Sequence, residues 1–186
     1  MKEVEILVEV KETKENVLEK LNKYEYLGTK HTVDTYYYDP LRDNLKPENL
    51  SLKECFRTRV KGDKNYITYK VDNFDSDHNW IYSDEYETEV KDMAQVKNIV
   101  NHLGLKELVI IDSTKNFFNF ENYEIEFETV KDLGNFLEVE YQATEDFNNV
   151  LEVKSKIQEF INNLGFSVSE ELNMGKPELM LRKLNK

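Results

Sequence analysis

The sequence predicts a single α+β domain, residues 1–186, built around an antiparallel β-barrel. The chain has no Pro- or Gly-rich linker at which it would divide into two domains. Strand-like and helix-like segments are joined mostly by connections of hairpin length, which favours antiparallel pairing. Charged residues alternate along several strands, and a closed barrel with a wet lumen accommodates such faces whereas a dry core does not.

The elements follow from hydrophobic periodicity and cap residues. In the first strand, Val4, Ile6, Val8 and Val10 alternate with mostly charged residues. Further strands are predicted at residues 32–38, 56–60, 66–70, 80–90, 108–117, 123–130 and 136–142, and a short one after residue 166. Helices are predicted at residues 13–24, 93–103, 150–164 and 177–184. Thr13 and Asp92 suit helix N-termini, and Gly104 and Gly165 suit helix ends. Residues 41–51 and 72–79 read as loops.

Composition excludes several classes of function. The net charge of -12 argues against an exposed nucleic-acid-binding surface, which needs a basic patch. No apolar run approaches membrane-spanning length and the first residues lack an apolar targeting core, so we expect a cytoplasmic protein without membrane contact. Cys55 reads as a small strand residue. His31, His78 and His102 lack metal-ligand spacing.

A cluster of basic residues is predicted on one hairpin. In the strand Phe56-Arg57-Thr58-Arg59, the two arginines share a face because side chains alternate along a strand. Residues 61–65 have turn composition, and the following strand brings Lys70 alongside. Such a cluster predicts an anion-binding site.

Carboxylates recur at the same period of two. The runs are Glu3/Glu5, Glu85/Glu87/Glu89, Glu124/Glu126/Glu128 and Glu138/Glu140. Together with the basic hairpin, they predict a polar cavity that binds a polyanion with a divalent metal.

Six motifs occur in a defined order along the chain. They are Glu3-Val4-Glu5-Ile6-Leu7, Asp34-Thr35-Tyr36-Tyr37, Phe56-Arg57-Thr58-Arg59, Tyr69-Lys70, Glu85-Tyr86-Glu87-Thr88-Glu89, and Leu133-Gly134-Asn135-Phe136-Leu137-Glu138-Val139-Glu140. This series resembles the CYTH superfamily, the triphosphate tunnel metalloenzymes, which include class IV adenylyl cyclases, thiamine triphosphatases and inorganic triphosphatases.

The resemblance implies an eight-stranded antiparallel tunnel that holds a triphosphate with Mg²⁺ or Mn²⁺. The implied phosphate-binding residues are Arg57, Arg59, Lys70 and Lys115. The implied metal ligands are Glu3, Glu5, Glu138 and Glu140, and the implied tunnel-lining carboxylates are Glu85, Glu87, Glu89, Glu126 and Glu128. No catalytic side chain is assigned.

Two positions depart from the family pattern. Leu7 stands where the opening motif has a lysine. Ser113-Thr114-Lys115 stands where a later Lys-x-Arg pair is expected, so one cation is lost and the other is changed. Lys11 shares the face of Leu7 but lies roughly 13 Å further along the strand.

The implied function is metal-dependent hydrolysis of an inorganic, thiamine or nucleoside triphosphate. Alternatives are a class IV adenylyl cyclase-like nucleotidyl cyclase and, because of Leu7 and Ser113, a degenerate module that binds phosphate or polyphosphate without turnover. A barrel used only for protein contacts is a third reading. The expected partner is a small triphosphate, with no nucleic acid or membrane, and a homodimer is left open.

Overall fold

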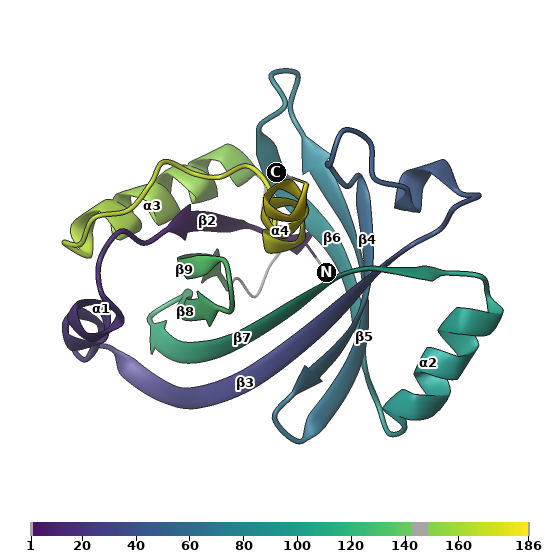
Figure 1. Ribbon diagram of the computed structural model, residues 1–186. Coiled ribbons are helices and arrows are strands. Elements are labelled where there is room, and N and C mark those ends of the chain that lie inside the picture. The colour runs from purple at the N-terminus through teal and green to yellow at the C-terminus, as the bar shows by residue number, and fades with distance from the viewer. Residues whose placement is uncertain (1, 143–148, 186) are drawn as a thin grey trace.

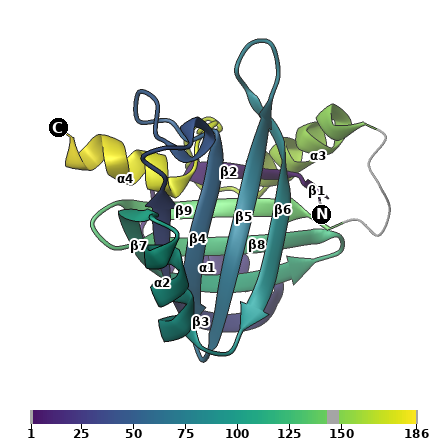
Figure 2. The same ribbon diagram turned by 90° about the vertical axis from the view of Figure 1, so that its right-hand side faces the viewer.

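The computed structural model describes residues 2–142 and 149–185, which are organised around one antiparallel sheet curled into a ring (Figure 1). Its strands are β1 (Lys2–Glu3), β2 (Glu5–Glu9), β3 (Glu25–Tyr38), β4 (Glu54–Lys61), β5 (Lys64–Phe74), β6 (Trp80–Val90), β7 (Lys106–Phe120), β8 (Tyr123–Val130) and β9 (Gly134–Tyr141). They are hydrogen-bonded in the order β1-β6-β5-β4-β3-β7-β8-β9-β2. Figure 2 shows β4, β5 and β6 side by side.

The N-terminal segment closes the ring. β1 pairs with β6 and β2 pairs with β9, and only Val4 lies between these two short strands. One stretch of chain therefore joins both edges of the sheet, which leaves no exposed edge there. Counted as one wall strand, it completes eight, so the predicted antiparallel barrel is confirmed.

The helices are α1 (Lys14–Leu21), α2 (Met93–His102), α3 (Val150–Asn163) and α4 (Lys176–Leu184), with a single 3-10 turn, η1, at Asp43–Leu45. The predicted N-caps are confirmed: the side chains of Thr13 and Asp92 accept hydrogen bonds from the third residue beyond each. Gly104 follows α2 with a φ of 87°, a conformation that glycine adopts without strain.

Two strands, β3 and β5, extend several residues beyond their predicted bounds, and one predicted strand is reduced to a bridge. β3 begins at Glu25 because it pairs with β7 along almost its whole length, with a register shift between Tyr26 and Gly28. β5 continues through Asp72 to Phe74, so the predicted loop there starts later. The strand predicted after residue 166 is only a bridge between Val10 and Val168. In β3 and β5, pairing partners extend strands that local sequence does not signal.

The largest apolar core lies outside the ring. Val4, Ile6 and Val8 face away from the lumen and pack with the outward side chains of β8 and β9. α1 and α3 cover this wall, α1 through Val17 and Leu21 and α3 through residues such as Ile157. Because the hydrophobic face points outward to the helices, the inner face is available for polar residues.

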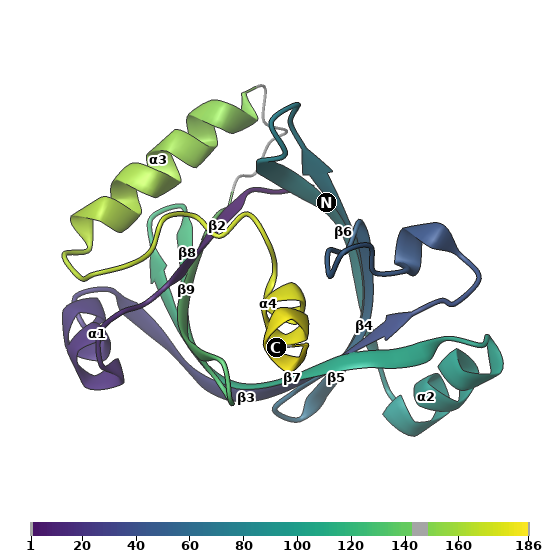
Figure 3. The ribbon, with the colours of Figure 1, turned by 45° about the horizontal axis from the view of Figure 1, so that its top comes forward.

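α4 closes one end of the ring. Figure 3 shows it seen within the circle of strands, and its Met180 and Leu181 pack against inward-facing residues that include Leu7, Tyr36 and others of the same cluster. This apolar plug separates the polar lumen from solvent at that end. No helix among the described residues is long and apolar enough to cross a membrane.

Candidate functional site: a charged tunnel

A cavity of about 230 Å³ lies inside the ring. Its lining comes from strands all round the barrel and from the start of α4. Among the described residues that line it, eleven are carboxylates and six are basic. The basic ones are Arg57, Arg59, Lys61, Lys70, Lys115 and Lys176. An excess of buried carboxylates is costly without further positive charge, so the cavity is suited to cations as well as anions.

Arg59 forms the best-formed ion pair of the site. It donates from Nε and Nη2 to the two carboxylate oxygens of Asp34, both at 2.7 Å. The neighbouring strands β3 and β4 place these residues directly opposite each other. Burial alone would raise the pKa of Asp34, but the charge and hydrogen bonds of Arg59, with the charge of Arg57, hold that pKa well below its usual range.

Arg57 is much less satisfied than Arg59. Its Nη1 donates to the Tyr36 hydroxyl at 3.2 Å, while its ion pairs with Asp34, Glu85 and Glu87 are 3.5–3.8 Å long. The Nε–H group of Arg57 is buried and has no hydrogen-bond partner among the described residues. A buried donor without an acceptor costs about 1–3 kcal/mol, so an oxyanion bound here would gain from it.

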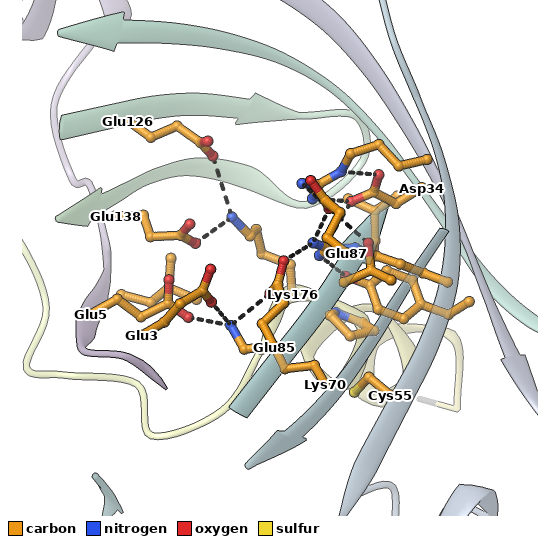
Figure 4. Close-up of a pocket in the computed structure, with 18 of the residues that line it drawn as sticks. Glu3, Glu5, Asp34, Cys55, Lys70, Glu85, Glu87, Glu126, Glu138 and Lys176 are labelled. Carbon is orange, nitrogen blue, oxygen red and sulfur yellow. Dashed lines mark hydrogen bonds and ion pairs between the residues drawn. The ribbon is translucent and has the colours of Figure 1, made fainter. Parts of the chain in front are cut away.

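Lys70 forms ion pairs with Glu3 and Glu5, the two carboxylates of the N-terminal segment (Figure 4). Its Nζ lies 2.6 Å from Glu5, 3.2 Å from Glu3 and 3.7 Å from Glu85. Burial would lower the pKa of Lys70, but these carboxylates raise it well above its ordinary value. Lys70 is therefore charged and serves as an internal counterion.

A second lysine cluster lies across the lumen. Lys115 of β7 is 2.6 Å from Glu126 and 3.7 Å from Glu128. Lys176, at the start of α4, pairs with Glu128 and lies 2.8 Å from Glu138, as Figure 4 shows for the latter. Sequence reasoning missed Lys176. Gly175-Lys176-Pro177 signals a helix start, but nothing local signals that this helix enters a barrel.

Four acidic residues lie on neighbouring strands at one side of the lumen. Glu5 pairs in register with Glu140, and Glu138 lies opposite Leu7. Burial raises the pKa of Glu3 to about 9, and burial with nearby carboxylates raises that of Glu140 to about 8. Within residues 2–142 and 149–185, the side chain of Glu140 has no hydrogen bond or ion pair.

The four carboxylates could hold a hard divalent cation, because such ions prefer oxygen ligands. They belong to Glu3, Glu5, Glu138 and Glu140. No three such side chains in the described part of the chain already converge as a metal cluster. Lys70 lies between Glu3 and Glu5, and Lys176 contacts Glu138. The lysines thus supply the positive charge that a bound cation would bring.

The tunnel brings together most of the residues singled out in the sequence. Those lining it are Glu3, Glu5, Arg57, Arg59, Lys70, Glu85, Glu87, Lys115, Glu126, Glu138 and Glu140. Two of the expected residues, Glu128 and Glu89, are not among those that line the cavity. Glu128 shares the inward face of β8 with Glu126, but it is only 1% exposed and is covered by its partners Lys115 and Lys176 instead of lining the cavity. Glu89 lies outside the tunnel, because it is near the end of β6, where its side chain is 55% exposed and pairs with Lys64.

The two departures from the family pattern have different surroundings. Leu7 packs in the apolar plug with Met180 and Leu181 of α4. Glu138, which lies opposite Leu7 on the neighbouring strand, forms an ion pair with Lys176. Lys176 thus supplies the positive charge that a lysine in place of Leu7 would bring. Ser113 is buried, and its hydroxyl has no hydrogen-bond partner among the described atoms.

Comparison with known proteins places these features in a family. The model of the CYTH domain family matches residues 1–172. A protein of Methanocaldococcus jannaschii, named "Putative adenylate cyclase MJ0240", is 29% identical over 140 residues, which are 74% of this chain and 75% of that protein.

Solved structures share the fold. The PH1819 protein of Pyrococcus horikoshii OT3 superposes with a TM-score of 0.79 at 24% identity, covering 96% of this chain and 99% of that one. HpAC1 from Hippeastrum, described as having a dominant triphosphatase activity, gives a TM-score of 0.63 at 15% identity over 99% of this chain and 96% of that one.

Proposed function

The chain belongs to the CYTH domain family, and from this membership we propose that it hydrolyses a small triphosphate inside its charged tunnel, with Mg²⁺ or Mn²⁺ as cofactor. The observation that carries the proposal is the buried Nε–H group of Arg57, which has no acceptor among the described residues. It lines the same cavity as Arg59, Lys70 and Lys115. Phosphate oxygens suit these donors because a guanidinium binds them in a bidentate fork.

The basic side chains bind and orient the substrate. Arg57 would donate from Nε and Nη to one phosphoryl group, and Arg59 would stay aligned through its two bonds to Asp34. Phosphoryl transfer depends mainly on positioning and on neutralising charge, so fixed cations supply much of the rate. Burial, together with the charge of Asp34, raises the pKa of the Tyr36 hydroxyl to about 12. The hydroxyl therefore stays protonated, and it accepts a hydrogen bond from Arg57.

The acidic side of the tunnel would hold the metal. Glu5, Glu138 and Glu140 are the inward carboxylates of β2 and β9, and Glu3 precedes them on β1. A divalent cation bound there supplies neutralisation of phosphate charge and activation of the attacking water. Lys70 and Lys176 would then exchange carboxylate partners for phosphate oxygens, which keeps each lysine paired.

Cyclisation of a nucleoside triphosphate is the second candidate, favoured by the name of the Methanocaldococcus jannaschii relative. Hydrolysis is preferred because the lining is rich in groups for phosphate and metal. The Hippeastrum protein of the same fold, described by its triphosphatase activity, supports this preference.

Phosphate release separates these candidates. Tripolyphosphate, ATP and thiamine triphosphate are each incubated with the protein and Mg²⁺ or Mn²⁺, and products are separated by chromatography. Hydrolysis predicts orthophosphate, whereas cyclisation predicts pyrophosphate and a cyclic nucleotide from ATP alone. Tight binding without any product would instead identify a non-catalytic binding module.

Arg57→Lys tests the residue that carries the proposal. The variant keeps a charge but loses the fork and the Nε donor. We expect turnover to fall by about 10²–10³-fold, as for the loss of one donor to a transition state. Arg42→Lys is the matched control, because Arg42 lies outside the tunnel and its side chain is 57% exposed. Equal activities of the two variants would contradict the proposed role of Arg57.

A further inference from the structure

Lys61 is a third basic residue on the inward face of β4. Arg57, Arg59 and Lys61 are each two residues apart, so their side chains project to the same side of the strand. All three line the tunnel cavity. No sequence motif includes Lys61, which belongs to the turn that the sequence predicts at residues 61–65.

Lys61 differs from the other lining cations in its partners. The other five, namely Arg57, Arg59, Lys70, Lys115 and Lys176, each form an ion pair with at least one carboxylate. Lys61 forms none within 4.0 Å among the described residues, although the lining holds more carboxylates than cations. Instead, its Nζ lies 4.3 Å from the centre of the Phe117 ring.

The contact with Phe117 holds the ammonium group inside the tunnel wall. Phe117 is 6% exposed and lies on β7 in line with Lys115, two residues away. A lysine over an aromatic face is attracted to the ring, yet all three of its N–H donors stay available. The structure thus keeps a partly buried cation over the ring, with no carboxylate of the described residues within 4.0 Å although the charge of Glu126 acts on it from further away.

The three cations form a track longer than the arginine pair alone. Arg57 and Arg59 are separated by roughly 7 Å along the strand, and Arg57 and Lys61 by roughly 13 Å, from the rise per residue. Burial lowers the pKa of Lys61, the carboxylates of Glu126 and Glu124 raise it, and the charges of Arg59 and Lys115 lower it, so all four of these side chains lie near Lys61. An anion that extends along β4 past Arg59 would therefore meet Lys61 next.

We propose that Lys61 binds a phosphoryl group beyond the three held by the arginine pair and its neighbours, so that the tunnel prefers linear polyphosphates of four or more phosphates over tripolyphosphate. This rests on the proposed function of the same site. Binding lets Lys61 exchange a ring contact for charge-assisted hydrogen bonds, which are about twice as strong as neutral ones. Lys61 is thus a specificity-determining residue for chain length.

Calorimetry with hydrolysis-resistant imido analogues of tripolyphosphate and tetrapolyphosphate, in Mg²⁺, tests the proposal. We expect the wild-type protein to bind the tetraphosphate analogue about tenfold more tightly, corresponding to one added charged contact. Lys61→Met should remove this preference while changing triphosphate binding less than about twofold, and Lys61→Arg should keep it. Lys64→Met is the control, because Lys64 lies on the adjacent strand with its side chain 49% exposed.

The outcomes separate this proposal from the function on which it rests. A Lys61→Met variant that weakens both analogues equally, or that keeps the wild-type preference, overturns the role of Lys61. If the wild-type protein binds both analogues but releases no phosphate from tripolyphosphate, the proposed hydrolysis is wrong. The proposed preference for chain length is then decided by the ratio of the two dissociation constants. Failure to bind either analogue overturns both.

Discussion

At the scale of single residues, the two arginines of β4 differ in how completely they are paired. Arg59 is bound by both oxygens of Asp34, whereas Arg57 has one hydrogen bond, three longer ion pairs and an unpartnered Nε. The paired carboxylate fixes the position of the Arg59 guanidinium, whereas Arg57 keeps a donor that a ligand could use. Sequence alternation predicted that both face the lumen, but it could not distinguish these roles, because they depend on carboxylates from β3 and β6.

Asp34→Asn tests the fixing role through stability. The substitution leaves Arg59 buried without its carboxylate partner, so we expect the free energy of unfolding at neutral pH to fall by about 3–5 kcal/mol. Urea unfolding measures this difference. Asp112→Asn is the control, since Asp112 forms a more exposed pair with His31 and should cost no more than about 1 kcal/mol.

Asp34 also predicts a pH dependence. Its pKa is lower in the folded state than the ordinary value of about 3.9, so its stabilising contribution is complete above that value. The contribution is lost as the pH falls below about 4 toward the folded-state pKa, because protonation removes the charge that Arg59 binds. The stability gap between wild type and Asp34→Asn should therefore shrink on acidification. A gap that stays constant down to about pH 3 would contradict this account.

At the scale of elements, α4 provides both an apolar plug and a cation that faces the lumen. Its apolar side chains pack with Leu7, and its first residue, Lys176, reaches Glu138 and Glu128. The helix itself was predictable from its apolar periodicity and from Pro177. Its position was not, because local sequence does not encode which end of a barrel a terminal helix enters. Leu7 is consequently a packing residue of the plug, and the positive charge expected there comes from another element.

Lys176→Met tests this transfer of charge to α4. We expect tripolyphosphate binding in Mg²⁺ to weaken about tenfold, because one charged contact near Glu138 is lost. Lys183→Met serves as the control on the same helix, since Lys183 is exposed and its side chain donates to the backbone carbonyl of Asp132, outside the tunnel. Equal binding by the two variants, measured by calorimetry, would remove Lys176 from the site.

At the scale of the whole molecule, the main apolar core lies on the outer face of the barrel wall, and the charged residues face the lumen. The outward faces of β2, β8 and β9 form the main core with α1 and α3, and the inward faces carry charge. The alternation of apolar and charged residues predicted two such faces on each strand. Closure of the ring by residues 2–9, which pair with both β6 and β9, required the structure because pairing partners are non-local.

The separation of core from site predicts that stability and binding can be changed independently. Ile157 of α3 is fully buried in the outer core, so Ile157→Ala should lower the free energy of unfolding by about 2–5 kcal/mol. Triphosphate affinity of the folded protein should change little, since α3 does not line the tunnel. Leu151→Ala is the control, because Leu151 is 64% exposed on the same helix. A tenfold loss of affinity in Ile157→Ala would show that the wall and the lumen are coupled.

We propose above all that the lumen binds a triphosphate together with a divalent cation. A crystal structure of the protein soaked with tripolyphosphate and Mn²⁺ tests it directly, since anomalous scattering locates the metal. The account predicts phosphate oxygens on Arg57 Nε and on Arg59, and a metal peak beside Glu5, Glu138 or Glu140. Phosphate bound only on the outer surface, with Lys70 and Lys176 still on their carboxylates and no metal in the lumen, would contradict it.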